Sequence, residues 1–486
     1  MDLHFLTIAE AHRGLLEKKF SAVDLLKACQ DQIARSEHLN TFITRTDDLA
    51  LEQAKKVDEK LARGETIGVL EGIPSGMKDI FNTRGIRTTV ASKMLKDFVP
   101  PYESTATQKL KDANYSLLGK LNLDEFACGT TSEFSFIGPS LNPWNREYTA
   151  GGSSGGSVAA VSAGQVFYSL GTDTGGSIRL PASWSGCVSL KVTYGRVSRF
   201  GVTAMASSLD TIGPMARSVE DVALVLQVIA GHDPKDSTTP EVPVPDYTAD
   251  LNKGVKGLRI GVPKEYFMEG VDPEVKELVL NAIKEYEKLG ATVKEVSLPM
   301  TKYGVAIYYV LVPTELSTNL ARYDGIRFGH KPEADAADLV EYYKRSRGEG
   351  FGAEIKRRIM VGTFVSSAGY ADAYYKQALK ARTLVCQEFD SVFKEVDVLM
   401  APVVPSTAFK VGENLNNPLA LYMADILTLP ANVAGIPGLA VPCGFTSKGL
   451  PVGLQVIGPH WSEALLLQVG NAYEQATEWH KMHPKF

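Results

Sequence analysis

The sequence predicts an α/β fold, and three observations on the 486-residue chain support this prediction. From about residue 70 onward, short apolar runs alternate with glycine turns and with helical patterns, which is typical of α/β proteins. Hydrophobic residues make up 44% of the chain and charged residues 22%, as in ordinary globular enzymes with a large core. No clear linker divides the chain, so we expect a single domain over residues 1–486.

Three regions are expected within this domain. Residues 1–65 carry helical patterns and predict two or three surface helices, one of them capped by Ser21 with Asp24 three residues later. A core region follows over about residues 70–215. The Pro- and acid-rich stretch at about 233–250 predicts a long surface loop.

Local patterns place further elements. A helix is expected to begin at Pro273, with Asp272 as its cap and Gly290 as its stop. Another helix is expected over 158–163, directly after a glycine- and serine-rich loop. Short apolar runs predict strands at 116–119, 166–170, 258–262, 396–400, 439–441 and 452–457.

Composition excludes several classes of protein. The net charge is −5 with acids and bases mixed along the chain, which argues against a principal nucleic-acid binder. The five cysteines are far apart and form no CxxC pair, so neither a disulfide framework nor a zinc site is expected. The N-terminus lacks a signal-peptide pattern, and no run approaches the roughly 20 apolar residues of a membrane span. A cytoplasmic protein is therefore predicted.

Three glycine-containing segments carry the residues of most chemical interest. Lys78 ends Gly72–Asp79, Ser153 lies in Gly151–Ser157, and Ser177 lies in Asp173–Arg179, with no histidine between them. A serine hydroxyl becomes a nucleophile only when a neighbouring base takes its proton. Glycines allow backbone N–H groups to approach a reacting oxygen closely. One lysine, two serines and these glycines together predict a hydrolytic or acyl-transfer site.

Other interpretations of these segments are weaker. The Gly-Ser loop matches G-x-S-x-G, but none of the later histidines, including His232, His330 and His460, has a suggestive context. Ser75–Lys78 matches S-x-x-K, yet the S-D-N and K-T-G motifs of that class are absent. No phosphate-binding motif follows either loop. A purely structural use in turns and caps suits one such loop better than two flanking a single helix–strand unit.

The segment from about 70 to 199 resembles the amidase signature family. Gly-Gly-Ser-Ser-Gly-Gly-Ser and Asp-Thr-Gly-Gly-Ser-Ile-Arg are hallmarks of that family, and 75 residues separate Lys78 from Ser153, with 24 more to Ser177. Within the family, nearly the whole chain is similar to the glutaminase subunits of tRNA-dependent amidotransferases. Supporting stretches are Ala91–Leu95, Asn122–Ala127, Tyr194–Arg199, Ala206–Asp210 and Lys356–Met360. Ala150 and Leu180 depart from the pattern without touching the three catalytic positions.

The resemblance implies an α/β/α layered fold around a large mixed sheet and a role for each motif residue. Ser177 would attack an amide carbon, Ser153 would relay the proton, and Lys78 would be the base. Burial among apolar neighbours would have to lower the lysine pKa by about 3 units, to near 7. The Gly152–Ser153 peptide bond would be cis. The oxyanion hole would use backbone N–H groups of the loop that holds Thr174, Gly175, Gly176 and Ser177.

Three later residues resemble the set that holds glutamine in these subunits: Tyr308, Arg358 and Asp425. A guanidinium can bind an α-carboxylate and a carboxylate can pair with an α-ammonium, which suits an amino acid substrate. The choice of Arg358 over Arg357 and of Tyr308 over its neighbour depends on the resemblance alone. Asp173 and Arg179 flank Ser177, either as an ion pair that braces the loop or as substrate contacts.

The implied function is that of a glutaminase subunit. It would release ammonia from glutamine for the amidation of Glu-tRNA(Gln) or Asp-tRNA(Asn). Two partner subunits are implied, one that binds tRNA and activates it with ATP and Mg²⁺, and a small linking subunit. No metal or nucleotide cofactor is implied for this chain. The alternatives are a stand-alone amidase of the same family and a non-catalytic scaffold that kept the fold.

Overall fold

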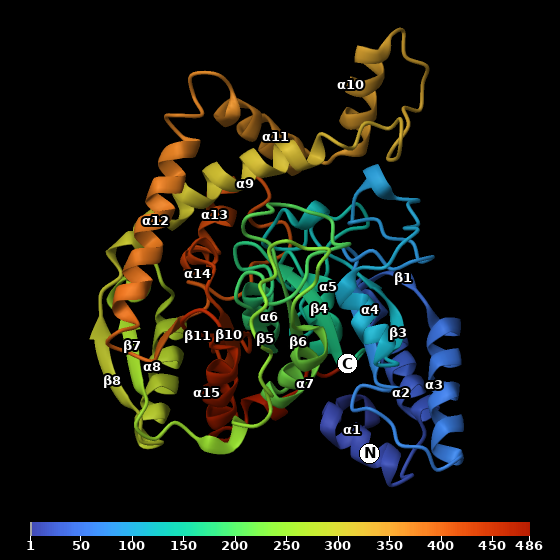
Figure 1. Cartoon of the computed structure of the whole chain (residues 1–486), viewed down its shortest axis with the longest axis vertical. Coiled ribbons are helices and arrows are strands. Elements are labelled where there is room, and N and C mark those ends of the chain that lie inside the picture. Colours follow the sequence, from blue (N-terminus) through green and yellow to red (C-terminus); the bar gives the residue numbers. More distant parts are fainter. Residues whose placement is uncertain (1) are drawn as a thin grey trace.

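The computed structural model describes residues 2–486, and its centre is one eleven-stranded mixed β-sheet (Figure 1). The strands run across the sheet in the order β1-β3-β2-β4-β6-β5-β10-β11-β9-β7-β8. In chain order they are β1 Phe42–Arg45, β2 Pro74–Lys78, β3 Ser116–Leu121, β4 Tyr168–Asp173, β5 Val188–Lys191, β6 Thr211–Ala216, β7 Arg259–Pro263, β8 Thr292–Val296, β9 Val398–Pro402, β10 Gly438–Phe445 and β11 Pro451–Ile457.

Two parallel groups of strands flank an antiparallel centre. Strand β2 pairs in parallel with both β3 and β4, and β7 pairs in parallel with both β8 and β9. Between them, β4, β6, β5, β10, β11 and β9 pair antiparallel in that order. Every residue of β2, β3 and β4 is buried, as expected for strands covered on both faces.

Fifteen α-helices lie among the described residues 2–486. They are α1 Ile8–Leu16, α2 Ala22–Arg35, α3 Asp47–Ala62, α4 Thr105–Asp112, α5 Gly155–Ser162, α6 Arg179–Ser185, α7 Val219–Ile229, α8 Pro273–Lys288, α9 Gly304–Leu320, α10 Leu339–Gly350, α11 Ala353–Ser366, α12 Tyr375–Val392, α13 Pro418–Met423, α14 Leu429–Ala434 and α15 Glu463–Ala476. Helices α5 and α6 pack together against the central strands, and α15 packs between α7 and α8. Together with the sheet, they confirm the predicted α/β fold.

The locally encoded elements agree with the sequence predictions. Ser21 and Asp24 form a capping box at α2, and the Asp272 side chain caps α8, which begins at Pro273. The expected strands at 116–119, 258–262, 439–441 and 452–457 correspond to β3, β7, β10 and β11. The strands expected at 166–170 and 396–400 each begin two residues later than predicted, as β4 and β9.

A separate helical layer lies beyond one end of the sheet. Figure 1 shows α9, α11 and α12 at the top of the molecule, with α10 projecting from it. Helix α11 packs along α9, and α12 packs against both α9 and α14. Within residues 2–486, none of the helices combines the length and the apolar character that a membrane crossing requires.

Candidate active site

Two adjacent parallel strands bring the predicted catalytic segments together. Strand β2 ends at Lys78 and β4 ends at Asp173, and Met77 of β2 is paired with Leu170 of β4. The carboxyl ends of parallel strands lie at the same edge of a sheet, where α/β proteins place their ligand sites. The loop that carries Ser177 follows β4 directly, so sheet topology places it beside Lys78 although 99 residues separate them in sequence.

Lys78 is hydrogen-bonded within the site. Its Nζ lies 2.9 Å from Ser153 Oγ and 2.8 Å from Thr172 Oγ1. Lys78 and Ser153 are fully buried, whereas Ser177 keeps 8% of its surface exposed. Of the three predicted catalytic residues, the nucleophile is therefore the one that a substrate can reach. Thr172 was not among the predicted site residues.

Burial changes the acidity of Lys78 as the sequence predicts. Removal of the ammonium group from water lowers the lysine pKa from 10.5 to about 7, even though nearby carboxylates of Asp124, Asp173 and Asp210 oppose this shift. At neutral pH a substantial fraction of Lys78 is then an uncharged amine. Such an amine can accept a proton, as a general base must.

The turn before α5 has the backbone geometry that the resemblance implies. The Gly152–Ser153 peptide bond is cis, which confirms the expectation. The Ser154 N–H donates to the carbonyl oxygen of Ser177 at 3.2 Å, so the two serine-bearing loops are in direct contact. The Gly152 N–H donates to Thr130 O at 2.8 Å, and Ser132 Oγ donates to Gly151 O at 2.7 Å.

The loop after β4 is closely packed from both sides. Gly176 has a φ of +141°, and a Cβ there would lie 2.3 Å from Thr428 Oγ1, so only glycine fits. The Thr174 hydroxyl donates to Asp210 Oδ1 at 2.6 Å. Burial raises the pKa of Asp210 to about 6, although hydrogen bonds from Thr174 and two backbone N–H groups oppose the rise. This packing fixes the loop from which the oxyanion hole is expected.

Asp173 and Arg179 form a fully buried ion pair across this loop. Arg179 Nε lies 3.0 Å from Asp173 Oδ2, and Arg179 also donates to Gln455 and Asn432. Burial alone would raise the pKa of Asp173, but the Arg179 guanidinium outweighs it and lowers the pKa to about 2. Because protein groups occupy both residues, the arrangement favours the bracing role over the substrate contact.

Helix α11 distinguishes the two adjacent arginines. Arg358 is buried and its Nε donates to Glu354 Oε1 at 2.8 Å, whereas the side chain of Arg357 is 43% exposed. The Arg358 guanidinium also lies over two aromatic rings, 5.5 Å from the centroid of Tyr309 and 5.6 Å from that of Tyr422. The inward orientation of Arg358 agrees with its selection from the sequence.

Asp425 lies buried near Arg358. Its Oδ1 has no hydrogen-bond partner within residues 2–486, and burial raises its pKa well above the ordinary value although Arg358 opposes this. A buried carboxyl oxygen without a partner is costly unless a ligand completes it. An α-ammonium group would supply the missing partner.

Both neighbouring tyrosines lie near this group. The ring of Tyr308 packs against Gly175, since a Cβ there would lie 2.7 Å from Tyr308 Cε2. Tyr309 lies under Arg358, stacks on Tyr422, and has a buried hydroxyl without a partner in the described part of the chain. Sequence reasoning named Tyr308 and omitted Tyr309. No sequence signal separates the two, because both lie in the same apolar helix.

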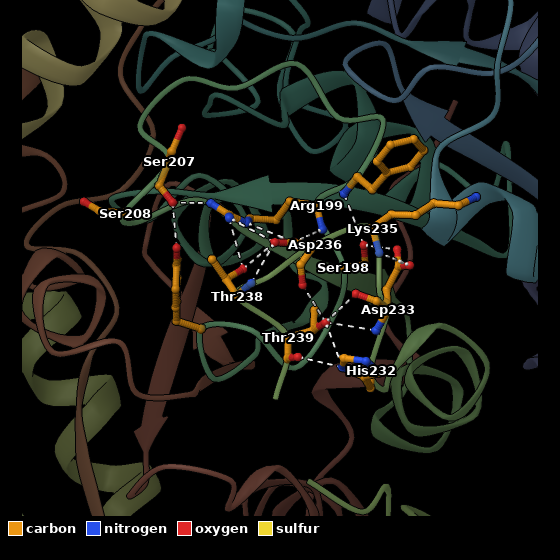
Figure 2. Close-up of polar contacts among 12 residues, drawn as sticks. Ser198, Arg199, Ser207, Ser208, His232, Asp233, Lys235, Asp236, Thr238 and Thr239 are labelled. Atoms are coloured by element: carbon orange, nitrogen blue, oxygen red, sulfur yellow. Dashed lines mark hydrogen bonds and ion pairs between the residues drawn. The ribbon is translucent and has the colours of Figure 1, made fainter. Parts of the chain in front are cut away.

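A cavity of about 170 Å³ adjoins the opposite end of the Lys78 hydrogen bond, with Thr172, Asp210 and Arg199 among its lining residues. Figure 2 shows how the loop that begins at His232 closes it. Arg199 donates to Asp236 through its backbone and its guanidinium, and Ser198 Oγ donates to Asp233 at 2.6 Å. His232 bonds to Thr239 in the same loop rather than to a catalytic serine.

Metal chemistry has no obvious place in this arrangement of residues. Over the described residues 2–486, no group of three or more His, Cys, Asp or Glu side chains has the geometry to hold a metal ion. The chemistry available here is that of a buried amine, two hydroxyl groups and backbone N–H donors.

Comparisons with known proteins agree with this chemistry. The family model described as Amidase matches residues 24–467. The chain is 53% identical over 481 residues to the A subunit of glutamyl-tRNA(Gln) amidotransferase of Geobacter sp. (strain M21), covering 99% of both chains. It is 52% identical over 486 residues to the protein of the same name from Carboxydothermus hydrogenoformans, covering 100% of both.

Solved structures share the whole fold. The crystal structure of the glutamyl-tRNA(Gln) amidotransferase A subunit from Thermotoga maritima matches with a TM-score of 0.82 and 38% identity, over 100% of this chain and 98% of that one. The native peptide amidase from Stenotrophomonas maltophilia matches with a TM-score of 0.84 and 33% identity, over 99% and 98%.

Proposed function

This chain belongs to the amidase family, and from that premise we propose that it is the glutamine-hydrolysing subunit of a tRNA-dependent amidotransferase. The observation that carries the proposal is the 2.9 Å contact between Lys78 Nζ and Ser153 Oγ in a buried site next to the Ser177 loop. Full-length identity of about half to the A subunits of curated amidotransferases supports this activity over that of a stand-alone amidase.

The proposed reaction uses the three motif residues in series. Neutral Lys78 takes the proton of Ser153, and Ser153 takes the proton of Ser177 as its Oγ attacks the side-chain amide carbon of glutamine. Backbone N–H groups of Thr174, Gly175 and Gly176 would stabilise the resulting oxyanion. The proton returns through Ser153 to the leaving nitrogen, and ammonia departs. Water then hydrolyses the glutamyl ester by the same route.

Glutamine would be held by the residues around Arg358. Its α-carboxylate would pair with the Arg358 guanidinium, and its α-ammonium would complete the unpartnered Asp425 Oδ1. Tyr308 would line the path between these groups and the Ser177 loop, because its ring lies against Gly175. Tyr309 would add its free hydroxyl to the same pocket.

The ammonia would serve a second active site on another chain. We infer a complex with two partner subunits, one that binds the misacylated tRNA and activates it with ATP and Mg²⁺, and one small linking subunit. The relatives are named as one lettered subunit of an amidotransferase for glutamyl-tRNA(Gln), which supports such an assembly and that acceptor. A cytoplasmic location suits an enzyme that prepares tRNA for translation.

Ammonia release from glutamine tests the proposal. The chain would be assayed alone and with its co-expressed partners, wild type beside Ser177→Ala. We expect release that the partners and charged tRNA increase and that Ser177→Ala abolishes. Turnover of another amide by the lone chain, with glutamine untouched under every condition, would support the stand-alone amidase instead. Full activity of Ser177→Ala would support the scaffold.

A further inference from the structure

A buried acid lies against the Ser153 turn without belonging to the reacting set. Asp124 follows β3 and is fully buried. Its backbone N–H donates to the carbonyl oxygen of Ser153 at 3.1 Å. Its carboxylate contacts Gly152 so closely that a Cβ at that position would lie 2.1 Å from Oδ2. Asp124 therefore contacts both residues of the cis peptide bond.

The same carboxylate holds a second segment against the turn. Oδ2 accepts from the Ser132 N–H at 2.9 Å, and Oδ1 accepts from the Phe134 N–H at 3.1 Å. Ser132 in turn donates to Gly151 O through its hydroxyl. One side chain thus ties the loop over 130–134 to the backbone that presents Ser153 Oγ to Lys78.

The charge of Asp124 also acts on Lys78. Of the groups that favour the ammonium form of Lys78, Asp124 has the largest effect, ahead of Asp173, Asp210 and Cys128. Asp173 is already paired with Arg179, and the Asp210 carboxylate is turned to Thr174 and two backbone N–H groups. Cys128 is a buried thiol whose pKa burial raises to about 12, so it is neutral.

We propose that Asp124 is a positioning residue with two effects: it braces the Ser153 turn, and it helps to keep a proton on Lys78. Backbone N–H groups are the partners that stabilise its carboxylate. A neutral side chain at this position would keep part of the brace and lose the field. The two effects are therefore separable by mutation.

The rate at which Ser177 reacts with a fluorophosphonate probe, measured between pH 5 and 9, separates them. This reaction needs Lys78 as base but neither glutamine nor any other chain. Asp124→Asn removes the charge, so the lysine loses its proton at lower pH, and the acid limb is expected to move down by about 1 pH unit. Burial raises the pKa of Asp124 itself to about 6, against hydrogen bonds from Phe134 and Ser132, so the wild-type and variant curves should converge below that pH.

Two further variants act as controls. Ser132→Ala removes the hydroxyl brace on Gly151 and keeps the carboxylate, so labelling should slow by about 10-fold with the limb unmoved. Asp221→Asn removes another fully buried carboxylate, which contacts Ile8 far along the chain, and should leave rate and limb unchanged. Should Asp124→Asn not fold, Asp124→Ser is smaller, also uncharged, and offers its hydroxyl to the Ser132 N–H.

A limb that stays at its wild-type pH in a folded, uncharged Asp124 variant would overturn the proposal, because a purely structural residue changes the rate at every pH alike. A limb that also moves in Asp221→Asn would overturn it as well. Movement in the Asp124 variants alone supports it. Failure of this experiment would leave the glutaminase proposal intact, since that proposal depends on Ser177 and on ammonia release.

Discussion

Thr172 Oγ1 lies 2.8 Å from Lys78 Nζ, so the proposed base has an acceptor besides Ser153. A neutral amine has two N–H bonds and one lone pair. If one N–H donates to Thr172, the lone pair is free to face the Ser153 hydroxyl. The threonine therefore determines the direction in which the base can act, although it takes no part in proton transfer itself.

Thr172→Val should slow ammonia release from glutamine by about 10- to 100-fold, because Lys78 loses the partner that orients its lone pair. The valine keeps the shape of the side chain, so the fold should be unaffected. Thr172→Ser retains the hydroxyl and is the matched control, with activity near that of wild type. Equal loss in the two variants would contradict the orienting role.

The pH dependence of the reaction should follow Lys78. Burial lowers its pKa to about 7, so the amine becomes neutral as the pH rises through that value. Glutaminase kcat is expected to rise on the alkaline side of an acid limb centred near pH 7. A profile that rises only near pH 10 would show that the lysine keeps its ordinary pKa and is not the base.

Lys78 should also cost the protein stability. Between pH 10.5 and 7 the unfolded chain binds a proton at this lysine and the folded chain does not, so stability falls as the pH falls through that window. Lys78→Met removes this penalty and fills the same space. We expect the inactive variant to be more stable than wild type at pH 7.5 by about 3 kcal/mol. Chemical denaturation at pH 7.5 and 10 should show the difference shrinking at the higher pH.

The adjacent arginines of α11 provide a matched pair. Arg358→Ala should raise the KM for glutamine by at least about 100-fold, since the buried guanidinium is the expected carboxylate partner. Arg357→Ala should leave KM within about twofold, because that side chain lies largely in solvent. Steady-state kinetics of ammonia release measures both. Equal effects would mean that the helix presents both side chains to the substrate.

Asp425→Asn should separate ligand binding from stability. The carboxyl group is buried without a partner at Oδ1 within residues 2–486, so an isosteric amide should not destabilise the ligand-free protein. Without a negative charge, however, the site loses its ammonium partner. Glutamine should therefore raise the melting temperature of wild type and not that of the variant. A glutamine-induced shift of equal size in both proteins would exclude Asp425 as the ammonium contact.

Motif chemistry made Lys78, Ser153 and Ser177 predictable, because few residue types can serve as base, relay and nucleophile among glycines. Helix caps such as Asp272 were predictable because the interaction is local. Strand β1 was not predicted, since its four residues are only partly buried and gain their order from pairing with β3. Thr172 and Asp124 gain their roles from contacts between distant segments.

The tyrosine and arginine pairs show a second limit. Successive residues on a helix point about 100° apart, so a sequence fixes their relative directions but not which one faces the pocket. Arg358 faces inward because α11 packs along α9, a contact that no local pattern encodes. The same contact brings Tyr309 under Arg358, which is why the resemblance to a family named only Tyr308.

The place of β10 in the sheet has a consequence for synthesis of the chain. This strand joins β5 to β11, yet it begins at Gly438, close to the end of the sequence. Until it leaves the ribosome, β5 has an open edge and the strands from β9 to β8 have no link to those that bear Lys78 and Ser177. Such long-range closure makes folding slow and exposes unpaired strand edges. Nascent chains should therefore need protection from aggregation until translation is almost complete.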